Sequence, residues 1–302
     1  MSFRRFLYLV AKDCADRSYS LRRIDTSRFF FRGPTEGTPT PLDGGCAGAA
    51  DPSAVEDGGR LPDPMINLRP LPLGPYPGSM GFVLFKNNVN NGEHDKIVAI
   101  DGTGRSLICD SDVPPTVHYL PTLFSPKFRP FSLTVGFSLY RPSHRSTYID
   151  SYAVVAGTSI VVSHNAGGRT YRFDTASKTW RKAGNWVLPF TCLAEYVPEH
   201  KLWFGVSSTN DGNRFCAADL VASPDSGEMR PPVVRGLWKE LGEPPPEWSL
   251  GQTYAVHLGS SRFCIVRFFV VVGGPVHVCP VSYSTFRVEE ELQAVITGVD
   301  VD

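Results

Sequence analysis

The chain has 302 residues, of which 42% are hydrophobic and 12% aromatic, a composition that supplies a core and excludes a disordered protein. Its 30 basic and 30 acidic residues cancel, which argues against binding to nucleic acid through phosphate neutralisation. No apolar run approaches the ~18 residues of a membrane span, so we expect no membrane contact. Seven cysteines without a C-x-x-C pair fit the reducing cytoplasm or nucleus, where we expect a monomer.

The N-terminal part is expected to begin with two paired strands, at Arg4–Lys12 and Tyr19–Asp25. From Gly33 to Pro64 glycine, proline and alanine dominate, which predicts a disordered insertion (33–64) within a single domain that spans residues 1–302. Met65–Pro77 is rich in proline and is expected to be extended.

A short motif in this extended segment suits partner binding. Arg69, Pro72 and Pro75 fit the basic-x-x-P-x-x-P pattern that peptide-binding domains recognise as a polyproline helix. A stiff connector into the next strand is the simpler interpretation of the same residues. We keep the three as candidate partner-binding residues.

A unit of four short strands follows, separated by turn residues. Its predicted strands are Ser79–Phe85, Lys96–Ile100, Ser106–Cys109 and Val117–Leu120. The stretch Asp101–Gly104 resembles a phosphate loop, but its third glycine and the following helix are missing, so we predict a hairpin turn. Only two strands, Phe131–Val135 and Ser138–Arg141, then precede the next unit, which indicates a truncated unit.

The stretch Ser151–Phe190 shows the repeated pattern most clearly, with Trp180 on the last of four strands. Its predicted strands are Ser151–Ala156, Ser159–Ser163, Thr170–Asp174 and Lys178–Ala183. The same order returns in Leu193–Pro198, Lys201–Ser207, Arg214–Leu220 and Leu237–Leu241, and again in Gln252–Leu258, Arg262–Val272, Val276–Ser282 and Thr285–Leu292.

Repetition of a four-strand order predicts an all-β fold, a kelch-like β-propeller of about five or six four-stranded blades with one blade truncated. A β-sandwich also consists of short regular strands and is the competing interpretation. The C-terminal run Ala294–Val301 is expected to pair with the N-terminal strands and thereby close the ring.

Several blocks of the sequence stand in the order known from one family. The blocks are FRRFLYLV, YSLRRID, KIVAIDGTGRSLICD, TYRFDTASKTWRKAGNWVLPF, AEYVPEHKLWFG, YAVHLGSSRFCIVRFF and, at the end, AVITGVDVD. Together they resemble a grass-expanded family of plant proteins of unknown function, which is similar to kelch-type propellers. Members of that family carry a longer segment after Ser138–Tyr140, in agreement with a truncated unit. The resemblance implies no catalytic residues.

The sequence offers no set of residues for catalysis, a cofactor or a metal ion. The seven histidines lack zinc-binding spacing, and no G-x-S-x-G elbow is present. Asp174 and Asp219 follow the third strands of two units and are expected to cap turns. We therefore expect no enzymatic activity.

Loops at the rim of a propeller are a natural recognition surface, because loops held on a rigid scaffold carry function. The candidate residues in such loops are Asn87, Asn91, His164, Arg169, Asn210 and Asp211. They lead us to predict a non-enzymatic scaffold that binds an unidentified protein partner. One alternative is an enzyme or carbohydrate-binding propeller with a site at the central rim pocket. Another is an adaptor that acts with a separate ubiquitin-ligase subunit.

Overall fold

The computed structural model describes residues 4–13, 16–30, 61–72, 78–85, 95–110, 114–124, 133–135, 138–140, 149–164, 167–208, 212–220, 229–238, 245–271 and 292–301. Regular structure in these ranges is β, apart from one 3-10 turn, η1 (Thr26–Phe29). Of the predicted insertion 33–64, residues 33–60 lie outside the described part of the chain.

The first sheet confirms the two predicted N-terminal strands and adds a third. Its strands, in the order β1-β2-β3, are β1 (Phe6–Asp13), β2 (Ser18–Asp25) and β3 (Ile66–Leu68). β2 buries Leu21 on the face that packs on the second sheet and Ile24 on the opposite face, against the last sheet. β3 was expected to be merely extended, but its three residues pair with Tyr19–Leu21 and cover the second edge of β2.

The second sheet is the predicted four-stranded unit, followed by the two-stranded one. It runs β4 (Met80–Phe85), β5 (Lys96–Asp101), β6 (Ser106–Asp110) and β7 (Val117–Leu120), and the next sheet pairs β8 (Leu133–Val135) with β9 (Ser138–Tyr140). The predicted hairpin turn at Asp101–Gly104 is confirmed. Asp101 Oδ1 accepts hydrogen bonds from the backbone N–H of Thr103 at 2.9 Å and of Arg105 at 3.1 Å.

Two predicted units are fused into one eight-stranded sheet, in the order β13-β12-β11-β10-β14-β15-β16-β17. Its strands are β10 (Ser151–Val155), β11 (Ser159–His164), β12 (Arg169–Asp174), β13 (Thr179–Gly184), β14 (Phe190–Val197), β15 (Leu202–Ser207), β16 (Phe215–Asp219) and β17 (Val233–Trp238). The first strands of the two units join them, because β10 and β14 pair in parallel from Ser151↔Cys192 to Ala153↔Ala194.

The last sheet corrects the expected strand order of the third repeat. Its strands are β18 (Trp248–Gly259), β19 (Arg262–Val271) and β20 (Leu292–Asp300), and β20 occupies the edge of β19 where Val276–Ser282 was predicted. β20 suits this place because it alternates: Ile296 packs on one face of the sheet and Val299 on the other. Residues 272–291 lie outside the described part of the chain.

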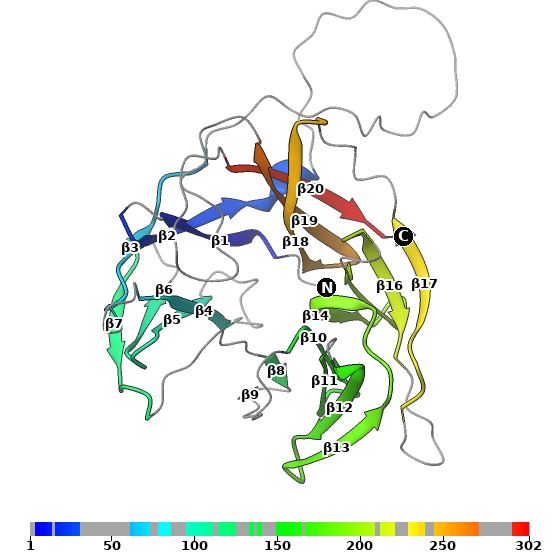
Figure 1. The fold of residues 1–302 in the computed structure, drawn as a ribbon. Helices are drawn as coiled ribbons and strands as arrows, with labels where there is room; N and C mark the ends of the chain where they lie inside the picture. Colours follow the sequence, from blue (N-terminus) through cyan, green and yellow to red (C-terminus); the bar gives the residue numbers. More distant parts are fainter. Residues whose placement is uncertain are drawn as a thin grey trace, which may run out of the picture.

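Figure 1 shows the sheets following one another in chain order around the molecule, with β4, β10, β14 and β18 nearest its middle and β7, β13 and β17 outside. Neighbouring sheets pack through shared clusters of buried side chains. Phe190 and Trp203 belong to the cluster between the β10 and β14 units, and Phe204 and Phe263 to the one between the β14 and β18 units. Three of these central strands, β10, β14 and β18, are called the innermost strands below.

The first and last sheets meet differently from the prediction. We expected Ala294–Val301 to pair with the N-terminal strands, but β20 pairs with β19 and lies in another sheet than β1. The two sheets meet instead through side-chain packing, in which Leu7 and Ile24 contact Leu258, Cys264 and Val266. One backbone hydrogen bond, from Arg4 N–H to the Leu258 carbonyl at 2.6 Å, also joins the two sheets.

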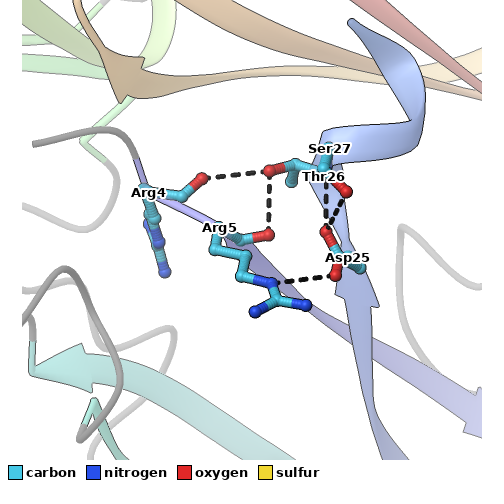
Figure 2. Close-up of polar contacts among 5 residues, drawn as sticks. All are labelled: Arg4, Arg5, Asp25, Thr26 and Ser27. Carbon is cyan, nitrogen blue, oxygen red and sulfur yellow. Dashed lines mark hydrogen bonds and ion pairs between the residues drawn. The ribbon is translucent and has the colours of Figure 1, made fainter. Parts of the chain in front are cut away.

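A polar network holds Arg4 in place for this contact, as Figure 2 shows. The buried Thr26 hydroxyl donates to the carbonyls of Arg4 (3.0 Å) and Arg5 (2.8 Å). Asp25 caps η1, since its Oδ1 accepts the Ser27 N–H at 3.0 Å, and it pairs with Arg5 at 3.0 Å. The turn after β2 thus fixes the residues before β1.

Candidate binding site at the innermost strands

The innermost strand β14 carries a bulge that shapes the site. Thr191 pairs with Val206 and Glu195 with Phe204, so three residues of β14 stand opposite Gly205 alone. Cys192, at the start of these three, has φ 63°, a value that few residues other than glycine adopt. Bulges redirect side chains and are frequent beside functional sites. This one turns the segment from β15 toward β10.

Gly205 makes the bulge possible. A Cβ atom at this position would lie 3.0 Å from Phe190 Cδ1, 3.3 Å from the Leu193 carbonyl oxygen and 3.5 Å from Ala194 Cα. Two of these three atoms belong to the backbone of the bulge, which cannot move aside by a side-chain rotation. The absence of a side chain therefore lets β14 approach β15.

The bulge also directs Glu195 toward the next sheet. Its Oε2 accepts the backbone N–H of His257, on β18, at 2.8 Å. A half-buried carboxylate is thereby held between two innermost strands by a charge-assisted hydrogen bond.

Two tyrosines and a thiol lie around this carboxylate. Burial raises the pKa of the Tyr152 phenol, and the nearby acids Cys192, Glu195 and Tyr254 raise it further. Burial also raises the pKa of Tyr254, with Cys192 adding to the effect, although 40% of the Tyr254 side chain is exposed. The parallel pairing of β10 with β14 and the hydrogen bond from His257 on β18 to Glu195 on β14 bring the three strands together.

The accessible part of this site is polar and aromatic. Cys192 and Gln252 are exposed, and the Tyr254 hydroxyl donates to Gln252 Oε1 at 2.7 Å. We call Tyr152, Cys192, Glu195, Gln252 and Tyr254 the inner-strand site.

Asp150 and His164 border the inner-strand site. The Cys192 N–H donates to the Asp150 carbonyl at 2.7 Å, and His164 Nδ1 lies 3.2 Å from Asp150 Oδ2. His164 was a predicted partner-binding residue, and Arg169 stands directly opposite it in the β11–β12 register. The structure therefore brings these two predicted residues together and places Asp150 between His164 and Cys192.

The other predicted residues lie elsewhere. Arg69 and Pro72 follow β3 and are exposed, and the Arg69 guanidinium forms an ion pair with Asp16, which lies between β1 and β2. The five predicted residues outside the described part of the chain are Asn87, Asn91, Pro75, Asn210 and Asp211. The predicted cap is confirmed for Asp174, whose Oδ1 accepts the N–H groups of Ala176 (3.0 Å) and Ser177 (2.8 Å).

Sequence reasoning missed the inner-strand site itself. Its residues are spread from position 152 to 254 and share no motif. The bulge leaves no sequence signal, because Thr191–Ala194 reads as an ordinary strand. The one usable signal for this site was the presence of polar or aromatic residues on the first strand of each unit.

In the ranges that the structure describes, no group of three or more His, Cys, Asp or Glu side chains is arranged to hold a metal ion. A helix with the length and apolar character of a membrane span is likewise not found there.

Comparison with solved structures gives only distant likeness. A structure described as "Complex structure of the fission yeast SREBP-SCAP binding domains" is 10% identical, and the match covers 98% of this chain and 79% of that one with a TM-score of 0.23. The WD40 domain of SCAP from fission yeast is also 10% identical, with 97% and 62% covered and a TM-score of 0.22. Among curated proteins, none matches the sequence.

A protein-family model accounts for nearly the whole chain. It matches residues 4–146 and 141–302, and the division falls directly after the two-stranded unit β8–β9. This confirms the resemblance to a family of unknown function. The chain belongs to the family described as "Protein of unknown function (DUF1668)".

Proposed function

We propose that this protein is a non-enzymatic interaction scaffold of the β-propeller type, kelch-like in its repeated units, that binds a protein partner in the cytoplasm or nucleus. Sheets that follow one another around the molecule in chain order support the propeller (Figure 1). The parallel pairing of β10 with β14 supports it too, since the first strands of neighbouring blades run in one direction.

The observation that carries the proposal is the convergence of three innermost strands at the inner-strand site. Tyr254, Gln252 and Cys192 remain accessible there, although they lie beside well-packed clusters. Tyrosine is enriched at interfaces because its ring supplies contact area and its hydroxyl a hydrogen bond. His164 at the end of β11 and Arg169 at the start of β12 border this area and extend the contact surface.

Affinity capture with matched variants tests this function. The tagged full chain is compared with Tyr254→Ala and with Tyr119→Ala, whose tyrosine is 86% exposed on β7, away from the inner-strand site. We expect a stoichiometric partner that is captured by the wild type and by Tyr119→Ala but lost with Tyr254→Ala. Equal recovery of that partner by all three folded proteins would refute a binding surface at the inner-strand site.

The same convergence favours one second candidate, a propeller that binds or converts a carbohydrate. Aromatic rings together with a fixed carboxylate, here Tyr152, Tyr254 and Glu195, are groups that bind sugars and, in enzymes, act on them. A glycan array, followed by a turnover assay on each bound glycan, separates the two candidates. Glycan binding that is lost with Tyr254→Ala, in a preparation that captures no protein partner, would replace the scaffold by this candidate.

A further inference from the structure

We propose that the outer edge of β13 takes an acidic β-strand from a partner protein. This inference rests on the scaffold function proposed above and adds a second contact surface, at one end of the eight-stranded sheet. It is carried by the open backbone edge of β13 and by the positive charge that the hairpin of β12 and β13 carries.

β13 ends the eight-stranded sheet and exposes one backbone edge. Its inner edge pairs with β12, and in the part of the chain that the structure describes no strand pairs with its outer edge. Figure 1 shows β13 on the outside of the molecule. Residues 179–182 pair with β12 in regular register, and the irregularity of this pairing lies beyond them. A regular open edge presents N–H and C=O groups with which an extended peptide can pair.

The β12–β13 hairpin carries an excess of positive charge, although the 30 basic and 30 acidic residues of the whole chain balance. Its acidic residue, Asp174, serves the turn, since its Oδ1 accepts the backbone N–H groups of Ala176 and Ser177. The basic residues of the hairpin are Arg169, Arg172, Lys178, Arg181 and Lys182. This excess of positive charge attracts an anionic partner.

Arg181 and Lys182 lie in the regular part of the open edge. Both side chains are exposed, and they point to opposite faces of the sheet because successive residues of a strand alternate. Neither side chain takes part in the ion pairs of the described residues. By contrast, Arg235 on β17, at the other end of the sheet, pairs with Asp219 at 3.6 Å. The charge on β13 is therefore available to a partner.

The same two cations determine which strand the edge accepts. Lysine and arginine on an edge strand discourage the addition of an uncharged strand. A second copy of this chain is disfavoured as well, since pairing β13 with β13 brings like charges together. A strand with glutamate or aspartate opposite Arg181 and Lys182 forms cross-strand pairs of opposite charge instead. Charge complementarity thus selects an acidic strand, and backbone pairing supplies the rest of the affinity.

Trp180 holds β13 in place before a partner arrives. Its ring packs against Phe173 of β12 with centroids 4.9 Å apart, and Phe173 belongs to a cluster with the buried Ile160 and Val162. An edge that is already ordered loses little conformational entropy when a strand is added to it.

The test measures binding of short peptides to the full wild-type chain by fluorescence anisotropy. The probe is an acetylated, amidated hexapeptide with two glutamates at its centre, flanked on each side by valine and threonine, so that its two charges face opposite sides of a strand. The same peptide with two glutamines or two lysines is the control. We expect the glutamate peptide to bind, the glutamine peptide to bind about tenfold more weakly, and the lysine peptide not to bind.

Hydrogen exchange separates strand addition from contact through charge alone. Mass spectrometry of peptides that cover residues 179–184 should show slower amide exchange when the glutamate peptide is bound. Residues 202–207, which form the interior strand β15, should exchange at an unchanged rate.

Two variants locate the binding. Arg181→Gln combined with Lys182→Gln removes both charges from the edge and should weaken binding of the glutamate peptide about tenfold. Lys201→Gln, at an exposed lysine between β14 and β15, is the matched control and should behave as the wild type. Equal affinity for the glutamine peptide, unchanged exchange at residues 179–184, or an unaffected double variant each overturns the inference. Binding of a single-stranded oligonucleotide or an anionic vesicle, without binding of the glutamate peptide, overturns it too.

The outcome is distinguishable from failure of the proposed function. A partner lost with Tyr254→Ala, combined with no binding of the glutamate peptide, would leave the scaffold standing and refute the acidic strand. Binding of the peptide at β13 without any Tyr254-dependent partner would do the reverse.

Discussion

Replacing Arg4 with alanine is expected to destabilise the protein because it breaks a buried ion pair between Arg4, which precedes β1, and Asp95, which precedes β5. Arg4 Nη2 lies 3.5 Å from Asp95 Oδ2, and the two side chains are 12% and 2% exposed. Removing one partner of a buried ion pair costs about 3–5 kcal/mol, since the remaining charge stays buried. This pair is long and Asp95 makes further contacts, so we expect about 2–3 kcal/mol.

Urea unfolding at neutral pH measures this loss, with Arg5→Ala as the matched control. Arg5 lies next in the chain and pairs with Asp25 at 3.0 Å, but the two side chains are 61% and 35% exposed (Figure 2). An exposed pair of this kind contributes at most about 1 kcal/mol. A double-mutant cycle with Asp95→Asn isolates the interaction. If Arg4→Ala costs no more than Arg5→Ala, the Arg4–Asp95 pair does not stabilise the fold.

Three further predictions concern the bulge, the turns and the thiols. Gly205→Ala should lower the free energy of unfolding by about 1–3 kcal/mol in thermal or urea unfolding, because the added Cβ meets the backbone of the bulge. The control Gly102→Ala should be neutral or slightly stabilising, because no atom lies nearer than 3.9 Å to a Cβ added at Gly102. Burial alone would raise the pKa of Asp101, but hydrogen bonds from Thr103 and Arg105 outweigh it and lower the pKa below 3.8. The Asp101 carboxylate therefore stabilises the fold above its unfolded-state pKa, and this stabilisation is lost as pH falls through its folded-state pKa. Asp101→Asn should thus lower the free energy of unfolding at pH 7. On acidification below about pH 4 the variant should lose less of that free energy than the wild type, as measured by urea unfolding at both pH values. Iodoacetamide should modify Cys192 roughly a hundredfold faster than Cys109 or Cys264, because burial raises the pKa of those two thiols to about 11 and about 12; equal rates in peptide mass spectrometry would contradict the described burial.

The strands were predictable because their signals are local. Alternating β-branched and aromatic residues bounded by Gly, Asp or Asn located β5, β6 and β10 to β13 within one or two residues. The turn at Asp101 was predictable for the same reason, since an aspartate accepts the N–H groups that follow it within the turn.

The partners of those strands were less predictable, because pairing depends on residues far apart in the sequence. The β-like character of Ala294–Val301 was recognised, but it did not reveal whether β1 or β19 would be its neighbour. Ile66–Leu68 lies between prolines and reads as a connector, and only the open edge of β2 makes it a strand. The inner-strand site depends on a bulge and on contacts between sheets, which explains why Tyr152, Glu195 and Tyr254 carried no signal.

Packing between neighbouring sheets supports the fold around the molecule. Clusters of buried side chains join the β10, β14, β18, β1 and β4 units in succession. The two remaining clusters, which contain Phe173 and Val98, each lie within one of the sheets that flank β8–β9.

Each flanking sheet covers its own apolar face. Phe173 packs against Trp180 with ring centroids 4.9 Å apart, and Tyr152 and Tyr171 border the same cluster. Large aromatic side chains on the outer strands β12 and β13 thus bury apolar surface within their own sheet. The packing between sheets runs through these five units. The network at Arg4 and Thr26 lies where the N-terminal sheet contacts the C-terminal sheet.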